Sequence, residues 1–237
     1  MIVRSVNDDA VLSPTTYVKI TLRQLWENLP QVLMADLLFV LCAAPALVLA
    51  LLSLVTPALL AAVLTAAPAW TAMLALLAAV TAPRSRDIGR AFFRAYRTAW
   101  RASVQMGTWI VVPALIAYGA WLQILLDGTA FVLWGLFFLG LLGLMFVAAL
   151  YLYAYPLVVL HEQPARVAAR NAFVLAGRYP LNTVGILALI ALGIALSVTV
   201  SWGLLVLWPA VWGLFVLNNC RLALRMEHER ENHTALT

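Results

Sequence analysis

Charged residues are scarce in this sequence: Asp, Glu, Lys and Arg make up 11% of its 237 residues, whereas 65% of the residues are apolar. Soluble globular domains carry about 25% charged residues, so this composition excludes that class and indicates a membrane protein. The few charges are uneven in sign, because 15 basic residues stand against 10 acidic ones. In a membrane protein such an excess bears on orientation, since Lys and Arg concentrate in cytoplasmic loops.

Residues and motifs that enzymes commonly use are few as well. Cys42 and Cys220 fall in different apolar segments near opposite membrane faces, so we expect neither a disulfide nor a metal site. His161 and Glu162 are adjacent, but no second histidine follows at the spacing that places two zinc ligands on one helical face. The sequence also lacks a GxSxG motif, a glycine-rich phosphate loop and a pair of intramembrane aspartates. We therefore expect a protein that is not an enzyme and uses no metal or cofactor.

Long apolar segments are abundant, and each has the roughly 18 to 25 residues that a helix needs to cross a bilayer. The first segment, residues 32–55, is followed closely by a second, residues 57–80, and together they have the form of a hairpin. A third segment, residues 104–126, and a fourth, residues 130–156, are joined by the turn-forming residues 127–129. Two transmembrane hairpins are therefore predicted.

A third hairpin is predicted near the end of the chain. Residues 181–217 carry no charge, which is too long for one span of about 20 residues and sufficient for two. We place the break within residues 197–203. The sequence thus predicts an all-α, polytopic bundle of six transmembrane helices, and five spans, one of them long and tilted or bent, are the alternative.

The distribution of basic residues favours six spans. With six, all 15 basic residues fall on one side of the membrane, and Asp127 is the only charge in the opposite loops. Five spans would place the last three arginines on the other side. Because cytoplasmic loops are enriched in Lys and Arg, both termini are predicted to be cytoplasmic.

Residues 84–103 combine arginines with aromatic side chains and are predicted to form a basic amphipathic helix at the membrane interface. One face holds the apolar side chains of Ile88, Phe92, Phe93, Tyr96, Ala99 and Trp100. The opposite face holds Arg86, Arg90, Arg94, Arg97 and Arg101. We expect the aromatic rings at the headgroup boundary and the guanidinium groups toward anionic lipid, where each contributes about 1 kcal/mol, or toward an acidic partner. No nucleic-acid-binding module accompanies these charges, so we expect no nucleic acid as partner.

A second basic segment, residues 161–180, follows the fourth span. Its arginines are Arg166, Arg170 and Arg178. A mostly small apolar face, suited to close helix packing, is formed by Ala168, Ala172, Phe173, Leu175 and Ala176. Aligning the two basic segments matches Ala91 with Ala172, Phe92 with Phe173, Ala95 with Ala176 and Arg97 with Arg178. A duplicated unit and chance similarity are both compatible with these matches.

Polar side chains within the predicted spans are few, which argues against proton-coupled transport. The candidates are Asp36, Gln123, Asn218 and Asn219. We expect Asp36, near the cytoplasmic end of the first span, to pair with Arg23 or with an arginine of a following loop. Four tryptophans are candidates for deeper positions, where they would pack between helices or line a cavity for a sugar ring: Trp109, Trp134, Trp208 and Trp212.

The chain is predicted to form one membrane domain, residues 1–237, with polar ends. Residues 1–30 are expected to be cytoplasmic and amphipathic, and residues 226–237 to form a flexible cytoplasmic tail. The first apolar run begins after about 30 residues, so a cleavable signal peptide is not expected.

Three stretches resemble the YesL-like family of bacterial integral membrane proteins: LFVLCAAPALVL (38–49), RDIGRAFFRAYRTAWRAS (86–103) and ARNAFVLAGRYPLNTV (169–184). Their order and spacing cover most of the chain. The resemblance implies a compact bundle in the bacterial cytoplasmic membrane, without assigned chemistry and often encoded beside carbohydrate uptake systems. It supplies no catalytic residues, and this chain uses Ala, Leu and Arg where many relatives have Ile, Phe and Lys.

These observations predict a non-enzymatic accessory, scaffold or regulatory component of a membrane system. Its expected partners are the bilayer, anionic lipids at the cytoplasmic face and, from the resemblance, a membrane protein such as a carbohydrate transporter. The alternative function is a small-solute transporter or channel. A lipid-directed enzyme would need a polar cleft that gathers His161, Glu162 and nearby arginines. The substrate, the partner and the oligomeric state do not follow from the sequence.

Overall fold

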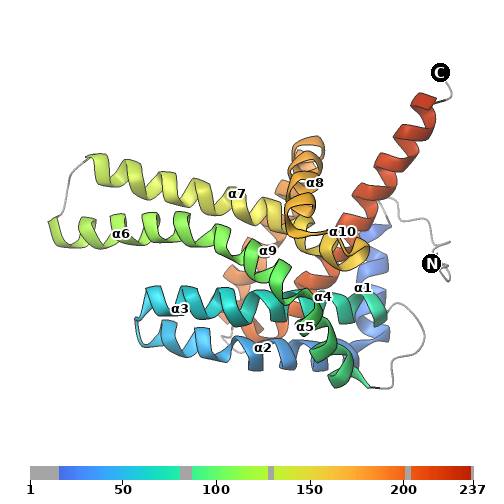
Figure 1. Cartoon of the computed structure of the whole chain (residues 1–237), viewed down its shortest axis with the longest axis horizontal. Coiled ribbons are helices and arrows are strands. Elements are labelled where there is room, and N and C mark those ends of the chain that lie inside the picture. Colours follow the sequence, from blue (N-terminus) through green and yellow to red (C-terminus); the bar gives the residue numbers. More distant parts are fainter. Residues whose placement is uncertain (1–15, 81–86, 128–130, 201–203, 236–237) are drawn as a thin grey trace.

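The computed structural model describes residues 16–80, 87–127, 131–200 and 204–235. Within these ranges the chain is helical apart from short connections and contains no strand, which confirms the predicted all-α bundle (Figure 1). In chain order the elements are α1 (Tyr17–Glu27), α2 (Leu29–Leu51), α3 (Val55–Ala61), the π-helical turn η1 (Ala62–Ala66), α4 (Ala67–Val80), α5 (Ile88–Gly107), the 3-10 turn η2 (Thr108–Ile110), α6 (Val111–Asp127), α7 (Phe131–His161), α8 (Ala165–Arg178), α9 (Pro180–Val200) and α10 (Leu204–Ala235).

Several of these helices are built to cross a membrane. In the described ranges, five stretches are long and apolar enough: Leu29–Leu51, Val55–Ala79, Ile88–Leu126, Phe131–His161 and Pro180–Thr199. The chain is therefore a membrane protein. The apolar region after residue 180 forms two helices, α9 and α10, as the sequence predicted, although residues 201–203 of the expected break lie outside the described residues.

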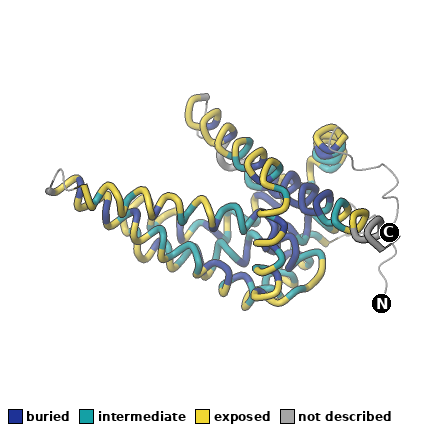
Figure 2. The backbone as a smooth tube through the Cα atoms, turned by 90° about the horizontal axis from the view of Figure 1, so that it is seen from above, coloured by how far each residue is buried: buried dark blue, intermediate teal, exposed yellow. Residues whose placement is uncertain are grey.

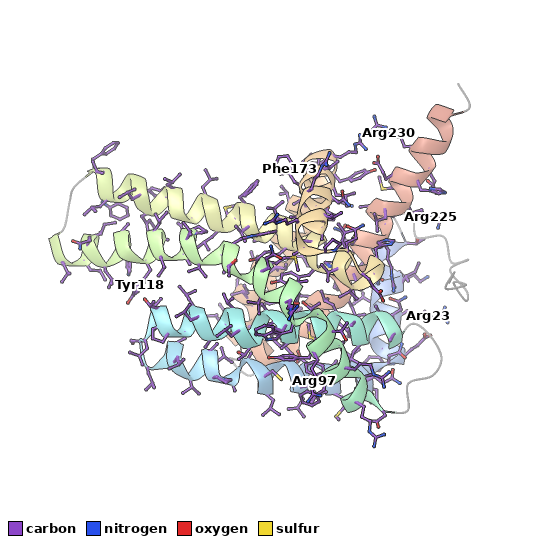
Figure 3. The ribbon with its side chains drawn as sticks, in the orientation of Figure 1. Arg23, Arg97, Tyr118, Phe173, Arg225 and Arg230 are labelled. Carbon is purple, nitrogen blue, oxygen red and sulfur yellow. The ribbon has the colours of Figure 1, made fainter. Side chains whose placement is uncertain are left out.

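The chain repeats one order of elements, in which an amphipathic helix precedes an apolar hairpin. Helix α1 precedes the hairpin of α2 with α3 to α4, α5 precedes the hairpin of α6 and α7, and α8 precedes α9 and α10. The tips of the first two hairpins lie at the left of Figure 1, and α1 and the last turns of α10 lie at the right. Figure 3 shows Arg23, Arg225 and Arg230 near the chain ends and Tyr118 on the arm toward the opposite side. This separation is what the positive-inside rule requires of the predicted topology.

The hairpins converge at one end and separate toward their tips. Buried residues gather where they meet, and exposed residues line the arm of α6 and α7 (Figure 2). On that arm Phe131 is 89% exposed and Leu142 is 64% exposed. Large apolar side chains are this exposed because hydrocarbon is the solvent for a membrane span. Within the arm, Gly140 allows close contact, since a Cβ there would lie 2.6 Å from the backbone nitrogen of Ala117.

Helix α5 packs differently from our expectation. Its aromatic side was predicted to lie in the headgroup layer. Phe92 is instead completely buried in the protein and α5 packs along α4, whereas Phe93 and Trp100 of the same side are 47% and 39% exposed. A local distortion of the helix before α4 contributes to this contact. Pro68 lacks an amide hydrogen, so the carbonyl of Leu64 loses its helical partner, and the preceding turn is π-helical. The indole nitrogen of Trp100 donates to this carbonyl at 3.3 Å.

Helix α10 extends into the segment for which the sequence suggested a flexible tail. Where a flexible tail was predicted from residue 226, helix α10 continues to Ala235. Two ion pairs stabilise the extension: Arg225 Nε lies 3.0 Å from Glu229 Oε1 one turn later, and Glu227 pairs with Arg178 of α8. Charged pairs four residues apart stabilise a helix, which compensates for the polar composition.

The predicted topology can be checked by labelling single cysteines introduced at opposite ends of the bundle. In a background with Cys42→Ala and Cys220→Ala, Ser53→Cys lies at the tip of the first hairpin and His228→Cys in the helical extension. We expect a membrane-impermeant maleimide to label Ser53→Cys in intact cells and His228→Cys only after permeabilisation, because the arginines hold that end inside. Labelling of both positions from the same side would contradict the topology.

Candidate functional site

A series of polar contacts follows helix α10, most of them buried, and connects it to helices α1, α2, α7 and α8. Beginning near its apolar half, α10 contacts α2 through Ala210, α1 through Asn218, α7 through Asn219, and the α8–α9 junction through Glu227. We call this set of contacts the α10 polar series. It contains three of the four intramembrane polar residues that the sequence singled out.

Asp36 accepts a backbone hydrogen bond instead of forming an ion pair. Its side chain is 2% exposed, and its Oδ1 accepts from the amide of Ala210 at 3.1 Å. Pro209 precedes this amide, and a proline inside a helix bends it and disturbs the neighbouring hydrogen bonds. The expected pairing with Arg23 is wrong, because Arg23 Nε binds Glu27 Oε1 at 2.6 Å on the exposed side of α1.

Asn218 and Asn219 bind across helices in opposite directions, and each is 1% exposed. The amide nitrogen of Asn218 donates to Gln24 Oε1 at 2.8 Å and to Thr21 Oγ1 at 3.0 Å, which fixes α1 on the bundle. That of Asn219 lies 3.4 Å from the hydroxyl of Tyr153 on α7. Hydrogen bonds between transmembrane helices are each worth about 0.6–2 kcal/mol, so this pair helps to hold three helices together.

Further polar contacts involve residues that sequence reasoning missed. The hydroxyl of Tyr17 donates to the carbonyl of Phe215 at 3.0 Å, and that of Tyr153 lies 3.1 Å from Thr183 Oγ1. Between α4 and α5, Thr71 Oγ1 and Ser103 Oγ are 2.6 Å apart. A small polar residue on an otherwise apolar helical face is the signal that could have indicated these positions, but it does not reveal which helix lies opposite.

The fourth intramembrane candidate does not join the others. Gln123 is exposed on α6, in the arm that leaves the bundle. Asp36, Asn218 and Asn219 are all hydrogen-bonded within the protein. Among the described residues, these four side chains therefore do not form a continuous row of available polar groups across the bundle.

The basic face of α5 is available at the surface. Asp87 caps the helix by accepting from the amide of Arg90 at 3.3 Å, and its other oxygen pairs with the same arginine. Arg94, Arg97 and Arg101 are exposed and have no ion pair with a described carboxylate. Arg86, the remaining predicted member of this face, lies outside the described residues.

The second basic segment has the predicted small-residue face with one exception. Ala168, Ala172 and Leu175 are buried, whereas Phe173 is 59% exposed and its ring lies 6.2 Å from that of Phe146. Phe173 was therefore wrongly assigned to the packing face, since it follows Ala172 by one residue and points away. Arg166 and Arg170 are exposed, and α8 contacts α5, so the two basic segments are neighbours.

Arg178 differs from the other predicted docking arginines because it is bound within the protein. It pairs with Glu227, and the hydroxyl of Tyr179 lies 3.3 Å from the second oxygen of that carboxylate. The hydrogen bond that Arg178 donates holds the pKa of Glu227 below its ordinary value. Arg178 therefore fixes α8 to α10.

A polar cavity of about 360 Å³ lies beside this contact. His161, Gln163, Asn171 and Glu227 contribute its polar lining. Gln163 and Asn171 bind each other at 3.0 Å and Glu227 is paired, which leaves His161 as the one polar side chain of this lining without a partner among the described residues. Glu162 does not line the cavity. The described residues also hold no cluster of three or more His, Cys, Asp or Glu side chains that could bind a metal ion.

No known protein family, curated protein or solved structure matches this chain. The resemblance to the YesL-like family therefore stays a prediction, and so does the absence of enzymatic activity.

Two substitutions at Asp36 distinguish a hydrogen-bond acceptor from a required charge. Asp36→Asn keeps an oxygen for the Ala210 amide and should leave the free energy of unfolding within about 0.5 kcal/mol of wild type. Asp36→Leu leaves that amide unpaired and should cost about 1–3 kcal/mol. Unfolding of the detergent-solubilised protein by denaturant measures both, with Gln123→Leu at an exposed site as control. An equal loss of unfolding free energy in Asp36→Asn and Asp36→Leu would show that the negative charge of Asp36 is required.

The contact between α8 and α10 should weaken in acid. Because the pKa of Glu227 is lowered in the folded protein, its contribution is full above the unfolded pKa and is lost as the pH falls through the folded one. As the pH falls from about 7 to about 3, we expect the amides of α8 to lose protection from hydrogen exchange relative to the amides of α6. Glu227→Gln should remove this difference, whereas Glu229→Gln, which alters only a pair within α10, should retain it. An unchanged profile in Glu227→Gln would refute the assignment.

Proposed function

We propose that this membrane protein is a non-enzymatic accessory or scaffold component whose basic α5 face docks an acidic cytoplasmic partner. The observation that carries the proposal is that Arg94, Arg97 and Arg101 are exposed and unpaired while the opposite side of the helix is packed against α4. A helix that only anchors itself in the interface keeps its apolar side for the lipid. Here Phe92 on that side is buried in the protein, while Phe93 and Trp100 are 47% and 39% exposed, so the helix is packed on the bundle and its charges face outward.

The arrangement of the charges favours an extended acidic surface as the partner. From Arg90 to Arg101 the basic row covers about 16 Å of helix, at 1.5 Å per residue. Arg166 and Arg170 of the neighbouring α8 enlarge the basic surface. Complementary charge of this kind steers association and fixes orientation. The resemblance to the YesL-like family points to a carbohydrate uptake system as the source of the partner.

A solute transporter is less well supported by the same structure. Asp36, Asn218 and Asn219 are each hydrogen-bonded within the protein, and Gln123 is exposed on α6. Transport of a polar solute through a bundle requires groups that replace its hydration. These four candidates do not supply such groups.

The docking surface can be tested with a photoreactive amino acid in place of Thr98, which is exposed between Arg97 and Arg101. In native membranes we expect one defined crosslink to an acidic segment of a second protein. The variant Arg94→Gln/Arg97→Gln/Arg101→Gln should reduce it by about tenfold or more, because three charge contacts of about 0.5–1 kcal/mol each are lost.

A control with the same change in net charge is Lys19→Gln/Arg23→Gln/Arg225→Gln, which alters other exposed basic residues and should leave the crosslink intact. Correct membrane insertion of both variants is checked with the maleimide, which must label Ser53→Cys in intact cells as it does in the otherwise wild-type protein. Crosslinks to lipid alone, or a protein crosslink that both variants retain, would contradict docking through this face.

A further inference from the structure

Helix α1 carries an apolar stripe on its exposed side. Val18, Leu22 and Trp26 follow one another at intervals of four residues and are 48%, 50% and 79% exposed. Side chains four residues apart are neighbours on a helix surface, so the three form one strip. A contiguous apolar strip at a protein surface marks a site of contact with another protein, a ligand or a membrane.

The opposite face of α1 is fixed to the bundle. Tyr17 and Thr21 are buried, and the hydroxyl of Tyr17 donates to the carbonyl of Phe215 at 3.0 Å. The side chain of Asn218 donates to Thr21 at 3.0 Å and to Gln24 at 2.8 Å. Turning the apolar stripe toward the bundle would break these contacts, so α1 presents it to the surrounding medium.

The apolar stripe continues into a surface that faces lipid. Helix α2, a span long and apolar enough to cross the membrane, begins at Leu29, and its exposed side includes Leu33 and Leu37 at 42% and 59% exposure. Figure 1 shows α1 running across the direction of α2, at the end of the bundle away from the hairpin tips. The medium around the stripe is therefore the leaflet in which α2 begins, which the arginines predict to be the cytoplasmic one.

A third face of α1 carries basic side chains. Lys19 and Arg23 are exposed, and each follows a member of the stripe by one residue, so they lie along its edge. Arg23 pairs with Glu27 at 2.6 Å, whereas Lys19 has no ion pair with a described carboxylate. A helix with an apolar face and a basic face lies in the membrane interface, with its apolar side chains about 5–10 Å into the boundary between headgroups and acyl chains.

We propose that α1 is an interfacial anchor that binds anionic phospholipid of the phosphatidylglycerol class. Val18, Leu22 and Trp26 insert among the upper acyl chains, and Lys19 and Arg23 attract the anionic headgroups. Tryptophan suits this depth, because its amphipathic ring favours the level of the headgroups. Sequence analysis assigned an interfacial role to α5, and the structure points to α1 instead. This site goes beyond the proposed docking function and does not depend on it, since none of its residues belongs to α5.

The depth of the stripe can be measured by fluorescence quenching of the full-length protein in nanodiscs. In a background with Cys42→Ala and Cys220→Ala, Leu22→Cys carries an NBD fluorophore, and phosphatidylcholine carries a nitroxide at the upper or the lower end of its acyl chain. We expect the upper nitroxide to quench the fluorophore at Leu22→Cys more strongly than the lower one. At Leu37→Cys, a lipid-facing position deeper in the span, we expect the opposite order.

The headgroup preference is measured with the upper nitroxide carried on phosphatidylglycerol or on phosphatidylcholine. We expect phosphatidylglycerol to associate with the site at Leu22→Cys about two- to fivefold more strongly, because basic groups near the surface attract anionic lipid. The variant Lys19→Gln/Arg23→Gln should abolish this preference and retain the depth, since it leaves the apolar stripe intact. The control Leu37→Cys should show no preference.

Three outcomes would overturn the proposal. The first is little quenching at Leu22→Cys by either nitroxide alongside strong quenching at Leu37→Cys, which would mean that water or a protein, including a second copy of this chain, covers the stripe. The second is equal association of the two lipids at Leu22→Cys. The third is a preference for phosphatidylglycerol that Lys19→Gln/Arg23→Gln retains. Thermal unfolding of each labelled variant identifies any loss of fold, and none of these outcomes bears on the crosslink at Thr98.

Discussion

Hydrocarbon offers no hydrogen bonds, so each polar group released inside a span needs a partner from the protein itself. Two of the contacts that meet this requirement lie beside prolines. At Pro68 the freed carbonyl of Leu64 accepts from Trp100, which holds α5 against the first hairpin. Next to Pro209 the amide of Ala210 donates to Asp36, which holds α10 against α2. Helices are therefore joined beside both prolines.

The same requirement explains why α10 is central. Its polar side chains would be costly in lipid, and each becomes favourable only because another helix supplies its partner. Asn218 and Asn219 point to opposite sides and so connect α1 with α7 through consecutive residues. Beyond the membrane the connection is completed by Glu227 and Arg178, a charged pair in water. Hydrogen bonds in lipid and an ion pair outside it thus secure one helix along most of its length.

The basic face of α5 and the interior of the bundle offer different environments. The basic face lies outside the bundle, and its exposed guanidinium groups suit a charged partner. A cavity of about 370 Å³ lies among the spans and is lined by apolar and aromatic side chains. The π-helical turn that contains Leu64, the acceptor of the Trp100 hydrogen bond, also contributes Ala62 and Ala66 to the wall of this cavity.

The sequence by itself determined that the protein is a membrane protein and which segments form its helices. Apolar runs of membrane-spanning length, the turn at residues 127–129 and the one-sided arginines predicted the helical hairpins, because these features depend only on local composition and periodicity. Tertiary structure decided which polar groups meet. Asp36 was expected to bind an arginine and binds a backbone amide 174 residues away, and a tail expected to fray is a helix because Glu227 reaches Arg178. Such pairings depend on how helices rotate and bend against one another, which side-chain spacing along one helix does not specify.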